Sequence, residues 1–146
     1  MGFVAEKWEE TSRRLAAQVA PHLGAGEALT GVVYATRPKL FSAALLAVGV
    51  TPSRLILVPV DRRLESAGPP VLVSREEITD AAVWGWGGSV RDFLSASAGN
   101  ELRFATATEK FRLHVLGGNL LEDTLSGPTQ RSGLEALIEF LLSAQR

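Results

Sequence analysis

The segment SAALLAVGVTPSRLILVPV, residues Ser42–Val60, decides the fold that we expect for this chain. Its first half, Ser42–Thr51, is almost entirely apolar, which is the pattern of a strand buried on both faces. Thr51-Pro52-Ser53 has the composition of a turn, because proline fixes the backbone at the first central position. Arg54–Val60 is rich in Leu, Ile and Val and predicts a second strand. The segment therefore predicts two strong strands joined by a tight turn.

Further strands are predicted on both sides of this unit. Before it, Glu27–Thr36 is rich in Val, Thr and Tyr and ends at Arg37-Pro38, because proline cannot donate to a β-ladder. After it, Asp61–Pro70 has the polar and proline-rich composition of a solvated loop. One helical turn is predicted at Ser74–Glu77. The remaining predicted strands are Val71–Val73, Ile78–Trp84, Asp92–Ser97, Leu102–Ala107 and Phe111–Leu116.

The last two strands alternate between apolar and polar residues, which indicates a hairpin with one buried face. We expect the hairpin to turn around Thr108-Glu109. The predicted register pairs Phe104 with Leu113, Leu102 with Val115 and, on the other face, Arg103 with His114.

The N-terminal segment has the apolar spacing of an amphipathic helix. Pro21 cannot lie in a helix interior without cost, so this helix should end near Ala20, with a further turn reaching Leu23. Its apolar positions are Trp8, Leu15, Val19 and Leu23.

The C-terminal segment is also predicted to be helical. Asn119 and Glu122 resemble a capping box that starts a short helix, which Gly127-Pro128 would close. Ser132 and Glu135 repeat that signal and predict the start of the final helix. This helix has an apolar stripe of Leu134, Leu137, Ile138, Leu141 and Leu142.

Length and element order predict one α+β domain. The chain has 146 residues, which is the usual size of a single domain, and no linker is long enough to divide it. We expect a single domain over 1–146, with an N-terminal helix in 1–24, strands in 27–116 and C-terminal helices in 119–146.

The composition limits which partners and which cellular compartment we expect. Fifteen basic and sixteen acidic residues leave a net charge of −1, which favours neither nucleic acid nor an anionic membrane surface. The chain has no cysteine, and its longest apolar run, Phe41–Val50, is too short to span a bilayer. The stretch Met1–Arg14 is rich in charge and lacks the apolar core of a secretion signal. We therefore expect a cytoplasmic protein without a transmembrane segment.

The order of elements and three stretches of sequence resemble the bacterial pleckstrin-homology-like (PH-like) domains, which are related in fold to GRAM domains. The stretches are Gly49–Val58, with its T-x-x-R-L turn between two strands, Val73–Ile78, and Phe104–Val115 followed by the final helix. The resemblance covers about Glu27–Gln145. It implies a partly open antiparallel β-barrel of about seven strands, with an added N-terminal helix and a C-terminal helix capping one end.

Catalytic and metal-binding patterns are not recognisable in the sequence. The only histidines are His22, beside a proline at a helix end, and His114, on the outward face of a strand beside Arg112. The chain has no G-x-S-x-G, no H-E-x-x-H and no EF-hand spacing. We therefore expect no enzyme activity, no catalytic residues, no metal site and no cofactor.

Four residues are candidates for contact with a ligand or partner. Arg37 and Lys39 are the basic residues after the first predicted strand, where phosphoinositide-binding pleckstrin-homology domains carry several. Two basic residues are too few to carry over headgroup binding. Trp84 and Trp86 lie at the glycine-rich segment GWGGS, where an exposed tryptophan could anchor a partner.

We therefore expect a non-catalytic binding or adaptor module that acts through protein–protein contact. The alternative is a carrier of a small apolar ligand or lipid, with a cavity lined by Trp84, Phe93 or Phe104. We also expect a homodimer, because apolar residues of the two terminal helices need a surface to cover. These residues are Trp8, Leu15, Val19 and Phe140.

Overall fold

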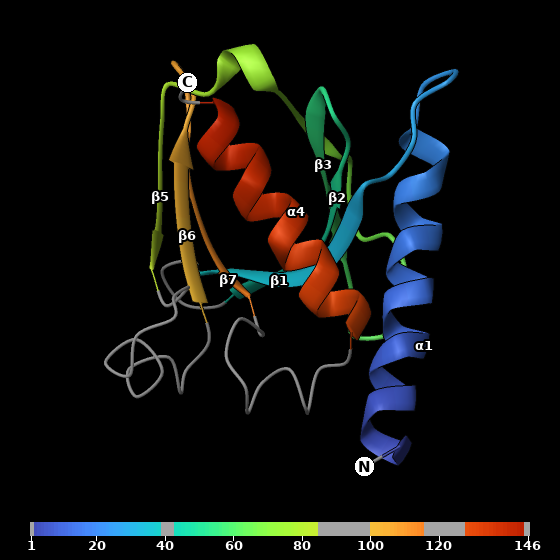
Figure 1. The fold of residues 1–146 in the computed structure, drawn as a ribbon. Helices are drawn as coiled ribbons and strands as arrows, with labels where there is room; N and C mark the ends of the chain where they lie inside the picture. The colour runs from blue at the N-terminus through green and yellow to red at the C-terminus, as the bar shows by residue number, and fades with distance from the viewer. Residues whose placement is uncertain (1, 39–42, 85–99, 116–127, 145–146) are drawn as a thin grey trace.

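The computed structural model describes residues 2–38, 43–84, 100–115 and 128–144 (Figure 1). In this part of the chain, seven strands form one sheet that two α-helices flank. In chain order the elements are α1 (Gly2–Val19), the 3₁₀ turn η1 (Ala20–His22), β1 (Gly31–Pro38), β2 (Ala43–Val50), β3 (Arg54–Val60), β4 (Val71–Ser74), the 3₁₀ turn η2 (Arg75–Glu77), β5 (Asp80–Trp84), β6 (Asn100–Ala105), β7 (Lys110–Val115) and α4 (Pro128–Ala144).

The sheet is antiparallel and open. Its strand order is β4-β3-β2-β1-β7-β6-β5, so β4 and β5 are the two edges. Strand β1 pairs along its whole length with β2, whereas within the described ranges it pairs with β7 at Ala35 and Thr36. The fold is therefore α+β, as the sequence predicted, and β1 joins the two halves of the sheet.

Helix α4 covers the inner face of the sheet. Figure 1 shows it crossing in front of the strands, between β5–β7 on one side and β2–β3 on the other. Leu134, Leu137 and Leu141 of this helix are fully buried against apolar side chains from all parts of the sheet. The predicted apolar stripe is thus the core of the domain, although Leu142 is exposed.

Helix α1 lies on the opposite, outer face of β1, β2 and β3 (Figure 1). Its residues Leu15 and Val19 form a second apolar cluster with Ile56, Val58 and other outward-facing residues of these strands. Strands β2 and β3 are therefore covered on both faces. For β2 this confirms the expectation from its continuous apolar sequence.

The N-terminal half of α4 also packs against the backbone of β1. A Cβ atom at Gly133 would lie 2.1 Å from the carbonyl oxygen of Val32, so only glycine allows this approach. Beside it, the buried side chain of Gln130 accepts a hydrogen bond from the N–H of Tyr34 (3.0 Å) and donates one to the Tyr34 carbonyl (3.1 Å). One side chain thus replaces a neighbouring strand at this point of β1.

Glu9 of α1 caps the start of α4. Its carboxylate accepts hydrogen bonds from the backbone N–H of Thr129 (2.9 Å) and from the Thr129 hydroxyl. A carboxylate at a helix N-terminus satisfies a free N–H and favours the helix dipole. The two terminal helices are therefore tied together, and α1 is an integral part of the fold.

The predicted register of the last hairpin was wrong by two residues. Phe104 pairs with Phe111, Arg103 with Arg112, and His114 with Glu101. The turn is centred on Ala107 and Thr108, because the Thr106 hydroxyl accepts hydrogen bonds from the N–H groups of Thr108 and Glu109. A shift of two residues leaves the buried face unchanged, so periodicity alone could not detect it.

Helix and strand ends differ from the predictions by a few residues. The final helix begins at Pro128 and not at Ser132, because Pro128 occupies the first helical position, where its missing N–H costs nothing. Strand β1 begins at Gly31 and not at Glu27. The predicted strand Asp92–Ser97 and the predicted short helix near Asn119 lie outside the described residues.

Phe140 is buried against the inner core, and Leu15 and Val19 are buried between α1 and the outer face of β1–β3. The apolar surface for which we expected a second copy is therefore covered within one chain at these three positions. The Trp8 side chain lies outside the described part of the structure, and the homodimer stays a prediction. No helix in the described ranges is long and apolar enough to cross a membrane.

Candidate functional site

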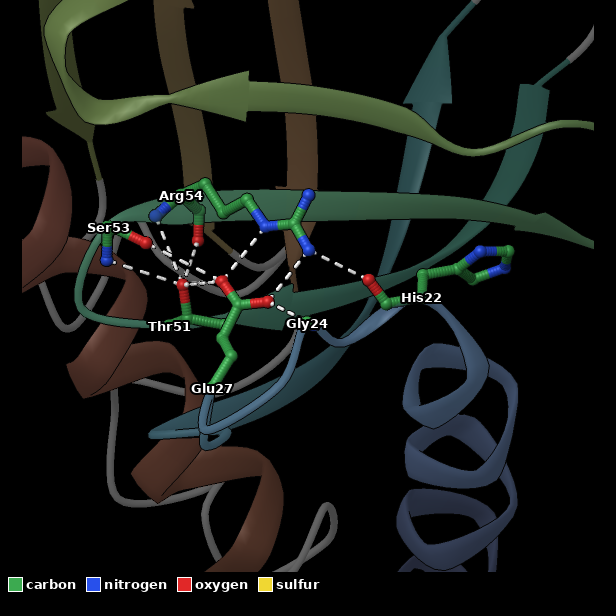
Figure 2. A network of polar contacts seen from close by, with 6 residues as sticks. All are labelled: His22, Gly24, Glu27, Thr51, Ser53 and Arg54. Carbon is green, nitrogen blue, oxygen red and sulfur yellow. Dashed lines mark hydrogen bonds and ion pairs between the residues drawn. The ribbon is translucent and has the colours of Figure 1, made fainter.

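The T-x-x-R sequence of the β2–β3 turn forms the densest polar network of the described residues (Figure 2). Arg54 makes two parallel contacts with the Glu27 carboxylate, from Nε to Oε2 (2.9 Å) and from Nη2 to Oε1 (2.7 Å). The Thr51 hydroxyl donates to Oε2 (3.1 Å) and the N–H of Gly24 to Oε1 (2.9 Å). Arg54 also donates to the carbonyl of His22 (2.8 Å).

These contacts change the proton affinity of both partners. The Arg54 guanidinium, with the N–H of Gly24, lowers the pKa of Glu27 from 4.5 to about 2. The same ion pair raises the pKa of Arg54. A carboxylate that accepts several hydrogen bonds is held in its charged form at any ordinary pH.

The network is structural. It fastens the segment between η1 and β1 to the turn between β2 and β3, two parts of the chain that share no strand pairing at this point. Both oxygens of Glu27 are already occupied, and the Thr51 hydroxyl also accepts from the N–H of Ser53 and Arg54. The T-x-x-R sequence thus closes a turn and anchors a loop, which agrees with its interpretation as a turn motif without chemistry.

The predicted contact residues are not brought together by the structure. Arg37 is on β1 and Trp84 ends β5, with β7 and β6 between these strands. The Trp84 side chain, Lys39 and Trp86 lie outside what the structure describes. The guanidinium of Arg37 is engaged within the chain: it pairs with Glu109 (2.7 Å), donates to the carbonyl of Lys110 (3.1 Å) and lies 4.6 Å from the centre of the Phe111 ring.

The engagement of Arg37 marks a place where β1 and β7 separate. Among the described residues, the two strands pair at Ala35–Val115 and Thr36–His114, and the pairing does not continue toward Pro38. Proline has no N–H to donate to the ladder, and the Arg37 side chain contacts the edge of β7 instead. On the outer face, a pocket of about 530 Å³ lies over this seam. We call it the seam pocket; Tyr34, Thr36 and Pro38 line it on the β1 side, and Arg112 and His114 on the β7 side.

A shared carboxylate stands beside the seam pocket. Oε2 of Glu101 accepts from Nε (2.9 Å) and Nη2 (2.8 Å) of Arg103, while Oε1 is 3.4 Å from Nε of Arg112. Oε1 is also 3.3 Å from Nε2 of His114, which is an ion-pair distance when the imidazole is protonated. The geometry is not that of a hydrogen bond, however, and Nε2 is shielded from solvent. The Glu101 carboxylate therefore lies close to three basic side chains.

Sequence reasoning placed His114 and Arg112 on the outward face but missed Glu101. The predicted register put Arg103 opposite His114, whereas Glu101 is the true cross-strand neighbour. The signal that could have found it is the T-x-x-E sequence at Thr106–Glu109, since a threonine that caps a turn fixes where the hairpin reverses. The pocket itself has no sequence signal, because it arises where two strands separate.

No protein-family model matches the chain, and no curated protein matches it. Solved structures do resemble it. The C-terminal domain of an unknown protein from Leishmania infantum is 16% identical, with a TM-score of 0.50, and the match covers 86% of this chain and 93% of that chain. The hSac2 domain of the human phosphoinositide phosphatase Sac2 is 12% identical, with a TM-score of 0.53, and the match covers 94% of this chain and 81% of that chain.

At these identities the likeness is one of fold. The hSac2 domain has a PH-like fold, and the seven-stranded antiparallel sheet of this chain, with its N-terminal and C-terminal helices, is consistent with that fold. The chain is therefore an α+β protein with a PH-like fold.

Proposed function

We propose that this domain is a non-catalytic binding module that acts through protein–protein contact at the outer face of β5, β6 and β7. One observation carries the proposal: α1 covers the outer face of β1–β3, whereas no helix of the described part contacts the outer face of β5–β7 to a comparable extent. That face presents exposed charged residues, and the seam pocket opens at its border with β1. A PH-like sheet with one open, charged face suits a module that binds another protein.

The packing of the interior favours this function over that of a carrier. Phe104, which would line the ligand cavity of the alternative carrier, is 2% exposed, and its ring stacks on Phe111 with 4.7 Å between the ring centres. The space around it is filled by the protein's own side chains. Phe93 and the Trp84 side chain, the other two expected lining residues, lie outside the described part.

The arrangement around His114 supports a role without catalysis. Glu101, His114 and Thr36 are cross-strand neighbours in the order acid, base and hydroxyl. In a catalytic triad the base must reach the hydroxyl by a hydrogen bond. Between these described residues no such bond is present, and Nε2 of His114 faces the carboxylate. We infer that these three residues contribute to the charge and the shape of a binding surface.

The test is affinity capture with matched charge reversals. Wild type, Arg112→Glu and Arg62→Glu are immobilised, extract from the source cell is applied, and retained proteins are identified and then purified for direct binding. Arg62 is an exposed arginine in the loop after β3, at the other end of the sheet. The expected result is a partner that binds wild type and Arg62→Glu and is lost with Arg112→Glu. If every purified partner binds all three proteins equally, the outer face of β5–β7 is not the contact surface.

A further inference from the structure

We propose that the seam pocket binds a carboxylate carried on an apolar group, which an acidic residue beside an apolar residue of the partner supplies. This inference rests on the proposed function and names the chemistry of its contact. It follows from three features of the pocket: an excess of positive charge on one wall, an apolar opposite wall, and a volume larger than a carboxylate needs.

The positive charge comes from the β7 side. Arg103 takes up one oxygen of Glu101 with two short contacts, so this carboxylate is already neutralised. Arg112 reaches the other oxygen only through Nε at 3.4 Å, and its side chain is 51% exposed. Its two terminal nitrogens have no partner among the described residues. A guanidinium in this state has a free edge that matches the two oxygens of a carboxylate.

His114 adds to the same wall. Its Nε2 is close to Glu101 without a hydrogen bond, so the imidazole shares a carboxylate that two arginines already contact. With Arg103, Arg112 and Glu101 counted, the cluster has one net positive charge when His114 is neutral and two when it is protonated. An incoming anion therefore meets a local charge of opposite sign.

The wall on the β1 side has a different character. Tyr34 and Pro38 present apolar surface to the pocket, and the Tyr34 ring also packs against the α1-side cluster. Burial of this ring raises the pKa of its phenol, so it stays neutral. A bare inorganic anion would leave this wall without a partner, whereas an apolar side chain next to the acid would cover it.

The volume agrees with a ligand of that size. At about 530 Å³ the pocket falls within the range of about 300–1,000 Å³ in which proteins bind compact ligands. A carboxylate alone fills a small part of it, and an acidic residue with an apolar neighbour fills more. The pocket lies over the two pairs that join β1 to β7 and extends past them to Pro38 and Arg112.

The first measurement uses short capped peptides as probes. The ¹⁵N-labelled protein is titrated with acetyl-Leu-Glu-Phe-amide and, as the matched uncharged probe, with acetyl-Leu-Gln-Phe-amide. We expect saturable changes in the amide signals of Thr36, Arg112 and His114 with the first peptide. Binding of the second should be weaker by about tenfold or more, because a charge-assisted contact is lost. Equal binding of both peptides would overturn the proposal.

The second measurement compares two variants that each remove one positive charge from β7. Arg112→Gln acts inside the seam pocket, whereas Lys110→Gln acts on an exposed lysine two residues away that does not line it. Arg112→Gln should weaken binding of the acidic peptide by about tenfold, and Lys110→Gln by less than about twofold. An equal loss in both variants would show attraction to general positive charge and would overturn the site.

Free phenylacetate separates this inference from the proposed function. If phenylacetate and the acidic peptide both change the signals of the seam pocket, and a captured partner depends on Arg112, both proposals stand. If a captured partner depends on Arg112 but neither probe binds there, the contact surface stands and the carboxylate pocket is overturned. If both probes bind there but no protein partner depends on Arg112, the ligand chemistry stands and the protein–protein function fails.

Discussion

The two halves of the sheet are both built from antiparallel strands, but they pack against different neighbours. Strands β1–β3 have a helix on each face, α4 inside and α1 outside, whereas among the described residues α4 is the helix that packs against β5–β7. The first half therefore needs apolar residues at nearly every position, and the second needs them at alternate positions. The difference shows that the N-terminal helix decides which part of the outer face is core and which part remains a surface.

One residue from each half of the sheet illustrates the difference between the covered and the open outer face. Ile56 of β3 and Arg112 of β7 both point to the outer face, yet Ile56 is fully buried and the Arg112 side chain is 51% exposed. Covering one half with α1 buries apolar surface, whereas the exposed charged residues of the other half form the surface on which we propose that a partner binds. Substitutions on the outer face should therefore have opposite consequences in the two halves, affecting stability in one and binding in the other.

The largest effect is expected from Ile56→Ala. The change removes a fully buried side chain between β3 and α1, and such truncations cost about 2–5 kcal/mol of unfolding free energy. Urea denaturation followed by circular dichroism measures it. Arg103→Ala, on the outer face of β6, is the matched variant and should cost at most about 1 kcal/mol. Comparable losses in both variants would contradict the division of the sheet into a covered and an open half.

Gly133→Ala should be the next most damaging change. In an exposed helix this substitution stabilises by about 1 kcal/mol, but here the added Cβ would meet the carbonyl oxygen of Val32. Forcing α4 away from β1 should cost about 1–3 kcal/mol, measured by thermal unfolding. Ser132→Ala, at the exposed neighbouring position, should stay within about 0.5 kcal/mol. A stabilised Gly133→Ala variant would show that the helix and the strand do not need this contact.

Glu27→Gln tests the anchor of the covered half by its dependence on pH. The pKa of Glu27 is lowered in the folded state to about 2, so its contribution to stability is complete above its unfolded value of 4.5. That contribution is lost as the pH falls from 4.5 toward 2. The variant should therefore be less stable than wild type at pH 7, and the difference should shrink over that window. A difference that does not change between pH 7 and pH 2 would mean that the ion pair with Arg54 does not stabilise the fold.

The smallest effect is expected from His114→Ala in the open half. The side chain is 39% exposed, and Glu101 keeps its contacts with Arg103 when the imidazole is removed. The unfolding free energy should change by no more than about 0.5 kcal/mol. A loss of several kcal/mol in chemical denaturation would place His114 in the structural core of the sheet and remove it from the binding surface.

Local sequence patterns predicted the covered half well. The bounds of β3, Arg54–Val60, agree with the prediction, and the two-faced burial of β2 follows from its continuous apolar residues. The prediction of an apolar stripe on the final helix was also correct for the leucines that are buried. These features depend on periodicity within one element, which the sequence contains in full.

The features that sequence reasoning missed depend on contacts between distant residues. Glu27 lies 27 residues from Arg54, and Glu9 lies 120 residues from Thr129, so no local pattern joins either pair. The partner of His114 was missed because the hairpin reverses one residue earlier than predicted. The seam pocket was missed because it follows from the separation of β1 and β7, which depends on packing of the whole sheet.

The two hydrogen bonds between the Gln130 side chain and the Tyr34 backbone have a consequence for the order in which the chain can fold. The two residues are 96 positions apart, and β1 pairs with β7 across a comparable distance. During synthesis, β1 leaves the ribosome early and can pair with β2. It can contact β7 and Gln130 only after β7 and the start of α4 have also left the ribosome. Closing such long loops comes late in folding and slows it. In a refolding experiment with pulsed hydrogen exchange, the amide of Tyr34 should therefore gain protection after those that pair β2 with β3.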